Sequence, residues 1–145
     1  MPTSSAGANA TRLPVLAVYH SSQNVYVAWD ESRDGVQKPY FNYSTNGGVT
    51  WQPSDRRIDH APVTVPAPLP RISCCGQNVY VLWVDARTGN NGIFFNRSTN
   101  GGASWQPTDT LVQTSSTDPW DPQLTCEGSH VYAVWLDSPV SDTDV

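Results

Sequence analysis

The chain has 145 residues, a formal net charge of −5 and only 14% charged residues, with 12 prolines, 10 glycines and 6 tryptophans. The 8 lysines and arginines are scattered, so no basic patch for nucleic acid is expected. No stretch approaches the roughly 20 apolar residues of a membrane-spanning helix, and the first dozen residues lack the apolar run of a secretory signal. We therefore expect neither a nucleic acid partner nor a membrane span.

Short strands separated by turn residues are predicted along the chain, and no window has the 3.6-residue apolar period of a helix. Residues 1–12 are small and polar, and we expect them to be flexible. Leu13-Pro14 precedes the first strand. The expected strands are 15–19, 24–30, 39–43 and 50–58, then 71–75, 78–84, 93–97 and 104–112, and finally 123–126 and 130–136.

The first two groups of four strands are copies of one unit. Residues 23–55 and 77–109 align without a gap and are identical at 19 of 33 positions. A third copy stops after its second strand. Four short strands repeated about every 50 residues are typical of a β-propeller. The prediction is an all-β, partial propeller domain over 1–145, with blade one at 13–66, blade two at 67–120 and half of a third blade at 121–145.

Two and a half blades are too few to close a ring, since propellers usually have about 4 to 8. An open stack would leave strand edges and an apolar face bare. Two sources of the remaining blades stay open: a longer chain, or self-association of several chains.

One loop sequence occurs in both copies, 54 residues apart. Asn and Gly suit a tight turn, Ser and Thr hydroxyls cap free amides, and a Trp can pack beneath the turn. These roles are structural. We call the two loops the first and second box; their shared residues are Ser44, Asn46, Gly48, Thr50 and Trp51, and Ser98, Asn100, Gly102, Ser104 and Trp105.

The boxes resemble the Asp-box, or bacterial neuraminidase repeat, Ser-x-Asp-x-Gly-x-Thr-Trp, with Asn in place of Asp in both copies. Together with the flanking strands, the resemblance covers most of residues 13–137. It implies a sialidase-like superfamily propeller in which each box joins the third and fourth strands of a blade, away from the active site. An extracellular or periplasmic location is a further implication of the resemblance.

Sialidases bind a substrate carboxylate with three arginines and use an acidic residue and a Tyr–Glu pair, so the resemblance also implies candidate catalytic residues. Arg12-Leu13-Pro14 is similar to the family's first arginine motif, and the loop holding Arg33 and Asp34 is similar to the one that supplies another arginine and the acid. However, Arg33 recurs as Arg87. A residue present in each copy is expected to serve the geometry of the repeat.

The sequence therefore favours a non-catalytic module with a recognition or scaffold role, a carbohydrate or protein ligand, and no cofactor or metal. The alternative is the N-terminal part of an exo-sialidase-type glycoside hydrolase, in which Arg12, Arg33 and Asp34 would act. Trp120 is expected to fill the junction between the second and third copies, with stacking on a sugar as its alternative.

Three cysteines match no metal-binding spacing. Cys74 and Cys126 occupy the same position of the repeat, so they could meet as a thiol pair or a soft metal site; otherwise they are buried and inert. Cys74 and Cys75 would point to opposite faces of a strand and are not expected to pair with each other.

Overall fold

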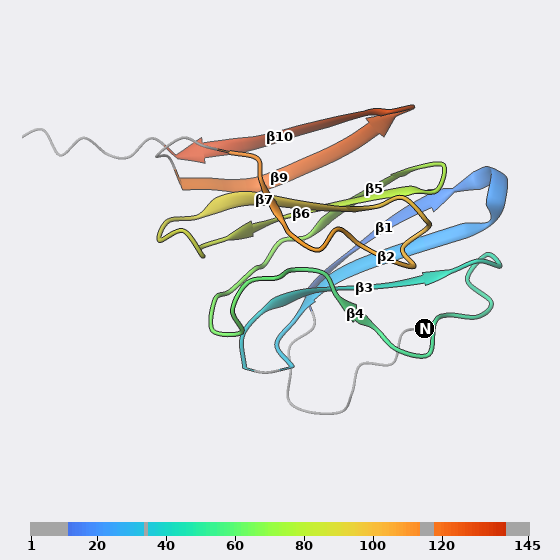
Figure 1. Cartoon of the computed structure of the whole chain (residues 1–145), viewed down its shortest axis with the longest axis horizontal. Coiled ribbons are helices and arrows are strands. Elements are labelled where there is room, and N and C mark those ends of the chain that lie inside the picture. The colour runs from blue at the N-terminus through green and yellow to red at the C-terminus, as the bar shows by residue number, and fades with distance from the viewer. Residues whose placement is uncertain (1–11, 34, 114–117, 139–145) are drawn as a thin grey trace, which may run out of the picture.

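The computed structural model describes residues 12–33, 35–113 and 118–138 and consists of antiparallel β-sheets (Figure 1). The predicted all-β class is confirmed: in these ranges the one helical element is a 3-10 turn at His20–Ser22. No helix in the described ranges is long and apolar enough to cross a membrane. The expected flexible segment 1–12 lies outside the described residues except for Arg12.

Three sheets follow one another along the chain. Sheet A contains β1 (Arg12–Tyr19), β2 (Asn24–Glu31), β3 (Lys38–Ser44) and β4 (Arg56–Arg57) in that spatial order. Sheet B repeats the order with β5 (Arg71–Cys75), β6 (Asn78–Asp85), β7 (Gly92–Ser98) and β8 (Thr110–Leu111). Sheet C is the hairpin of β9 (Asp118–Glu127) and β10 (His130–Ser138).

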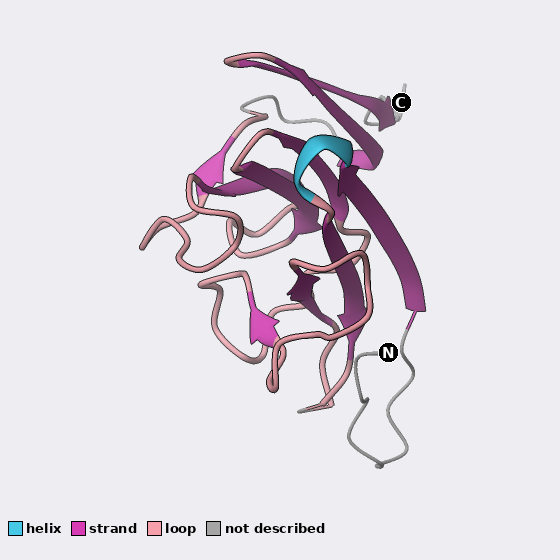
Figure 2. Ribbon diagram, turned by 90° about the vertical axis from the view of Figure 1, so that its right-hand side faces the viewer, coloured by secondary structure: helices cyan, strands magenta, loops and turns pink. Residues whose placement is uncertain are grey.

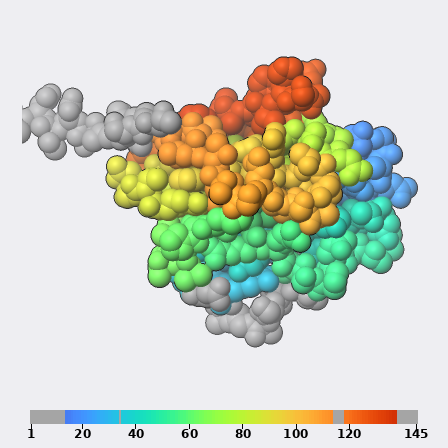
Figure 3. All heavy atoms as spheres, in the orientation of Figure 1, coloured from blue at the N-terminus to red at the C-terminus, as the bar shows by residue number. Residues whose placement is uncertain are grey.

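The sheets are stacked in chain order, with sheet C forming the upper layer of the molecule in Figures 1 and 3. The first strands of successive sheets are neighbours, because β5 contacts both β1 and β9. Figure 2 shows many of the connecting loops gathered on one side of the stack. No sheet closes into a barrel, and the propeller and its blade boundaries stay predictions.

Sheet B, the middle sheet, buries both of its faces, which explains why β6 is apolar at nearly every position. One face of sheet A packs against one face of sheet B, and the opposite face of sheet B packs against sheet C. The first contact joins Tyr26, Ala28 and Phe41 to Val79, Val81 and Trp83; the second joins Leu82, Val84 and Ile93 to Leu124, Ala133 and Trp135.

The predicted fourth strands, 50–58 and 104–112, are wrong in length, because β4 and β8 have two residues each. A side chain supplies part of the pairing here, beside a backbone hydrogen bond from the Gln52 amide to the Tyr43 carbonyl (3.2 Å). Asn42 accepts from the Gln52 amide through Oδ1 (3.1 Å) and donates to the Gln52 carbonyl through Nδ2 (3.2 Å). Pro53 then follows and has no N–H to offer. Asn96 and Gln106 form the same pair in sheet B, and the box tryptophans consequently lie before the fourth strands.

Pro14 recurs in the other two copies as Pro70 and Pro122. Pro14 was expected just before the first strand, but Pro14 and Pro122 both lie inside strands. Pro14 falls where the β1–β2 register shifts between Arg12 and Val15, and Pro122 falls opposite a shift in β10. A bulge tolerates proline because the extra residue makes no ladder hydrogen bond. β1 and β9 are therefore longer than predicted.

The disulfide joins Cys75 to Cys126, so both alternatives considered for Cys126 are wrong: it neither pairs with Cys74 nor stays an inert thiol. Equivalent side chains of stacked copies point the same way and cannot meet each other. The side chains of a strand alternate between its two faces. A cysteine that faces the next sheet therefore meets one that faces back, and the two occupy adjacent positions of the repeat. Cys74 remains a free thiol packed against the A–B core, and burial raises its pKa.

Candidate functional site

Arg87 is held by two carboxylates at the end of sheet B. Its guanidinium donates to Asp85 through Nε (3.0 Å) and Nη2 (2.5 Å), and to Asp109 through Nη1 (2.8 Å). Both carboxylates are fully buried, and the guanidinium carbon lies 4.1 Å from the centre of the Phe94 ring. Asp85 also accepts from the Trp83 indole at 3.3 Å. We call this arrangement the second clamp.

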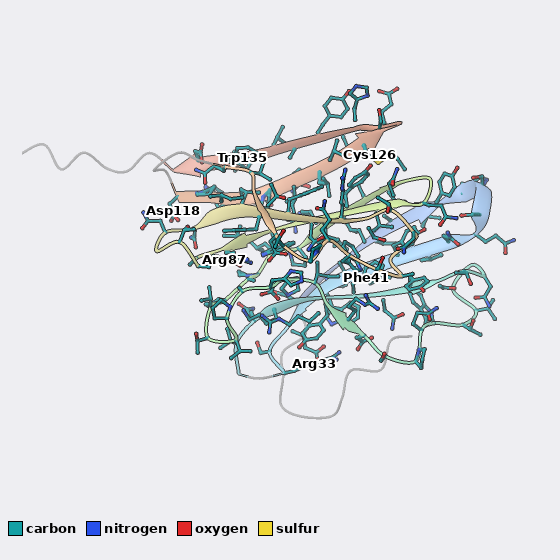
Figure 4. The ribbon with its side chains drawn as sticks, in the orientation of Figure 1. Arg33, Phe41, Arg87, Asp118, Cys126 and Trp135 are labelled. Carbon is teal, nitrogen blue, oxygen red and sulfur yellow. A yellow bond between two sulfur atoms is a disulfide. The ribbon has the colours of Figure 1, made fainter. Side chains whose placement is uncertain are left out.

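Arg33 forms the first clamp at the equivalent place in sheet A. It pairs with Glu31 at 2.9 Å and with Asp55, and lies 4.2 Å above the Tyr40 ring. Glu31 accepts from the Trp29 indole at 3.0 Å, as Asp85 does from Trp83. Figure 4 shows Arg33 in the lowest sheet and Arg87 in the middle one. Arg33 thus lies in an equivalent cluster, but both contacts come from its Nη2, and its buried Nε has no hydrogen-bond partner within the described ranges, unlike the Nε of Arg87.

The structure describes the three candidate catalytic residues to different extents. Arg33 is in the first clamp, Asp34 lies outside the described residues, and only the backbone of Arg12 is described, at the start of β1. The described ranges hold no group of three or more His, Cys, Asp or Glu side chains arranged to bind a metal ion.

Asp109 extends the second clamp to the preceding loop. It accepts from the His60 amide (2.7 Å), the His60 ring (2.8 Å) and Asn96 Nδ2 (2.9 Å), besides Arg87. Burial by itself would raise the pKa of this carboxyl, but the hydrogen bonds from His60, Arg87 and Asn96 outweigh it. The net effect is a pKa below the ordinary 3.8.

Asp109 should therefore make the fold acid-sensitive. A carboxyl whose pKa is lower in the folded state contributes stability above its unfolded pKa, and the contribution is lost as the pH falls through the folded value. In urea unfolding between pH 7 and pH 3, we expect Asp109→Asn to be less stable at pH 7 and to lose less stability on acidification than the wild type. The exposed Asp137→Asn should follow the wild-type profile; an unchanged acid profile in Asp109→Asn would contradict this assignment.

A second charged cluster breaks the repeat. Lys38 is 1% exposed, although its counterpart in sheet B is Gly92. Its ammonium donates to Asp59 (3.2 Å), to the carbonyl of Pro62 (2.8 Å) and to the carbonyl of Val65. Burial lowers the pKa of Lys38, while Asp59 opposes that effect. All three donors are satisfied, so Lys38 fastens the loop between the two sheets. Its lack of a counterpart in the repeat was the sequence signal that could have identified it.

The Ser, Asn and Thr or Ser side chains of the two boxes make the same turn hydrogen bonds. In the first box, the Ser44 hydroxyl accepts from the Gly48 amide (2.9 Å), and Asn46 Oδ1 accepts from the Thr50 amide (2.8 Å). Asn46 Nδ2 also donates to the Thr50 hydroxyl at 2.8 Å. The second box repeats all three contacts with Ser98, Gly102, Asn100 and Ser104. Each of these polar groups is used within its own turn.

The second box additionally packs on sheet A. A Cβ placed on Gly102 would lie 2.4 Å from the Phe41 ring, and the Trp105 ring meets Phe41 edge-on at 4.9 Å. In the first box the Trp51 indole donates to the Gly48 carbonyl at 3.1 Å, whereas the buried Trp105 Nε1 has no partner within the described ranges. Packing between the sheets has replaced that hydrogen bond.

A depression of about 420 Å³ lies beside this contact, within the ~300–1,000 Å³ range of small-molecule sites. Both aromatic and polar groups line the depression. Arg56 is exposed at its edge, and Tyr43 is half-buried against Phe41. The lining residues are Phe41, Asn42, Tyr43, Gln52, Pro53, Ser54, Asp55, Arg56, Arg57 and Gly102. This hollow could not be predicted from the sequence, because Gly102 of the second box completes a wall that otherwise belongs to β3, β4 and the loop between them.

No protein-family model matches the chain, and a search of curated proteins found no significant match. The function is therefore argued from the geometry.

Proposed function

We propose that the chain is a non-catalytic module of the Asp-box propeller type, with a recognition or scaffold role for a carbohydrate or protein ligand. The observation that carries this proposal is the repetition of the clamp. Arg33 and Arg87 bind equivalent carboxylates and lie over equivalent aromatic rings. A substrate carboxylate would have to displace a carboxylate that is already buried against each guanidinium.

The glycoside hydrolase alternative requires arginines that are free to bind the substrate carboxylate in a bidentate fork. The engagement of Arg33 weighs against it. For recognition, the depression next to the second box offers an aromatic face, several amide and hydroxyl groups and the Arg56 guanidinium. This mixture suits a carbohydrate, which presents hydroxyl groups beside apolar ring faces.

A glycan array probed with the purified chain tests the proposal. We expect binding that is weakened at least about tenfold, or 1.4 kcal/mol, in Arg56→Ala and Tyr43→Ala. Arg97→Ala is the matched control, because Arg97 is exposed at the repeat position of Tyr43 but does not line the depression. Equal loss in all three variants, or no glycan bound by the wild type, would overturn the carbohydrate assignment. Hydrolysis of a sialoside that Arg33→Met abolishes would overturn the non-catalytic role.

A further inference from the structure

The outer face of sheet C is apolar and uncovered. Tyr132 is 52% exposed and Val134 is 65% exposed, and Trp120 and Leu136 lie in the same half-exposed class. Figure 1 shows no described segment above this hairpin. At the other end of the stack, Leu16 and Val18 of β1 are exposed on the outer face of sheet A.

These surfaces are the two halves of a contact that the chain already makes twice. Tyr132 pairs with Thr125 as Tyr80 pairs with Ser73 and Tyr26 with Ala17, so the three tyrosines are equivalent. Tyr26 is 0% exposed in the A–B core, and Tyr80 is 4% exposed and stacks on Phe95, which packs against the B–C core. Tyr132 differs only in having no next sheet above it.

The same comparison applies to sheet A. Leu16 faces Val27 of β2 as Ile72 faces Val81 of β6, so Leu16 and Ile72 are equivalent. Ile72 is buried against sheet A in the A–B core, whereas Leu16 is bare. Among the described residues, no sheet covers the outer face of sheet A or that of sheet C.

We propose that the outer face of sheet C docks on the outer face of sheet A of a second copy of this chain, head to tail. This inference rests on the repeated-sheet architecture of the proposed function. The contact is head to tail because each sheet turns a different face to each of its two neighbours. The free face of sheet C therefore complements the free face of sheet A, and neither face complements itself. Such a contact joins different surfaces of the two copies, and its repetition gives a ring or a filament.

The native disulfide defines which positions should meet across this contact. Cys75 lies opposite Asn78 in its hairpin, and Glu127 lies opposite His130 in the same way. Cys126 lies opposite Val131, and Val18 lies opposite Val25 in the same way. The position equivalent to Cys75 is therefore Glu127 of one copy, and the position equivalent to Cys126 is Val18 of the next.

Cross-linking between two variants with one free cysteine each tests the proposal. Val18→Cys and Glu127→Cys are made in a Cys74→Ala background, which keeps the native disulfide, and are mixed in a glutathione redox buffer. We expect a linked dimer in the mixture, with peptide mapping to positions 18 and 127, and little or none with either variant alone. Leu16→Cys, on the same face but two residues away, is the register control and should link at least about tenfold less.

Three results would overturn the proposal: dimers of Glu127→Cys alone, which would mean that two sheet C faces meet; equal linking by Leu16→Cys; or no linking with sedimentation as a monomer at all concentrations. Sedimentation of Val134→Lys gives an independent readout. This variant should associate at least about tenfold more weakly than the wild type, because a charge would be buried at the contact. Val49→Lys, whose exposed side chain lies in the first box, should associate normally.

The glycan array separates this inference from the proposed function. The depression lies between sheets A and B of a single chain, so Val134→Lys should bind glycans as the wild type does. Retained binding without any association would overturn the docking alone, whereas association without glycan binding would overturn the carbohydrate assignment alone.

Discussion

Gly102→Ala should destabilise the protein by about 2 to 5 kcal/mol, clearly more than Gly48→Ala. The two glycines are equivalent, with φ of 87° and 90°, so both substitutions introduce the same backbone strain of about 1 to 2 kcal/mol. They differ in surroundings. A Cβ at Gly102 would be 2.4 Å from the Phe41 ring, whereas the nearest atom to one at Gly48 is 3.8 Å away, on Trp51.

The difference between the two variants isolates the contact between the second box and sheet A. Phe41 is 1% exposed and cannot move without disturbing the A–B core, so overpacking should add about 1 to 3 kcal/mol in Gly102→Ala. Urea unfolding measures both free energies. A double variant with Phe41→Leu should show a favourable coupling, since the smaller side chain makes room. Equal losses in Gly48→Ala and Gly102→Ala would contradict the packing of the second box on Phe41.

Arg87→Met should cost about 3 to 5 kcal/mol of unfolding free energy. The substitution keeps an apolar stem over Phe94 but leaves Asp85 and Asp109 buried without their cation, and breaking a buried ion pair has a cost of about this size. Arg87→Lys should recover only part of it, because an ammonium cannot reproduce the forked contacts with both carboxylates. Chemical denaturation gives the values.

The exposed Arg97→Met serves as the control and should change stability by less than about 0.5 kcal/mol. Introducing Asp85→Asn into Arg87→Met should restore part of the loss, because it removes one uncompensated buried charge. If Arg87→Met is as stable as Arg97→Met, the clamp does not support sheet B.

The pattern of apolar residues and turns predicted most strands closely. The strand expected at 71–75 is β5 residue for residue, β6 is one residue longer than expected at one end, and β7 is one residue longer at each end. Alternation of apolar and polar residues and the positions of Gly and Asn are local signals, and they determine these hairpins. The expected lengths of the fourth strands were wrong because the Asn42 and Asn96 side chains take over part of the hydrogen bonding between the third and fourth strands. Residue-by-residue strand propensity does not reveal such a role.

Contacts between sheets could not be predicted in the same way. The choice of Cys75 over Cys74 depends on which side chain faces the next sheet, and the packing of Gly102 on Phe41 joins two copies of the repeat. The depression arises at that junction as well. Because Arg33 recurs as Arg87, a role in the geometry of the repeat was expected for both. Both lie in a clamp with buried carboxylates, and that role stays a prediction.

The unfolding free energy of Arg33→Met, measured beside Arg87→Met, tests most directly whether the repeated residues build the sheets. Glu31 and Asp55 would be left almost fully buried without their cation, so the account predicts a loss of at least about 2 kcal/mol, with glycan binding unchanged under conditions where the variant is folded. Wild-type stability in Arg33→Met, together with loss of ligand binding or of sialoside hydrolysis, would contradict it and place Arg33 in a functional site.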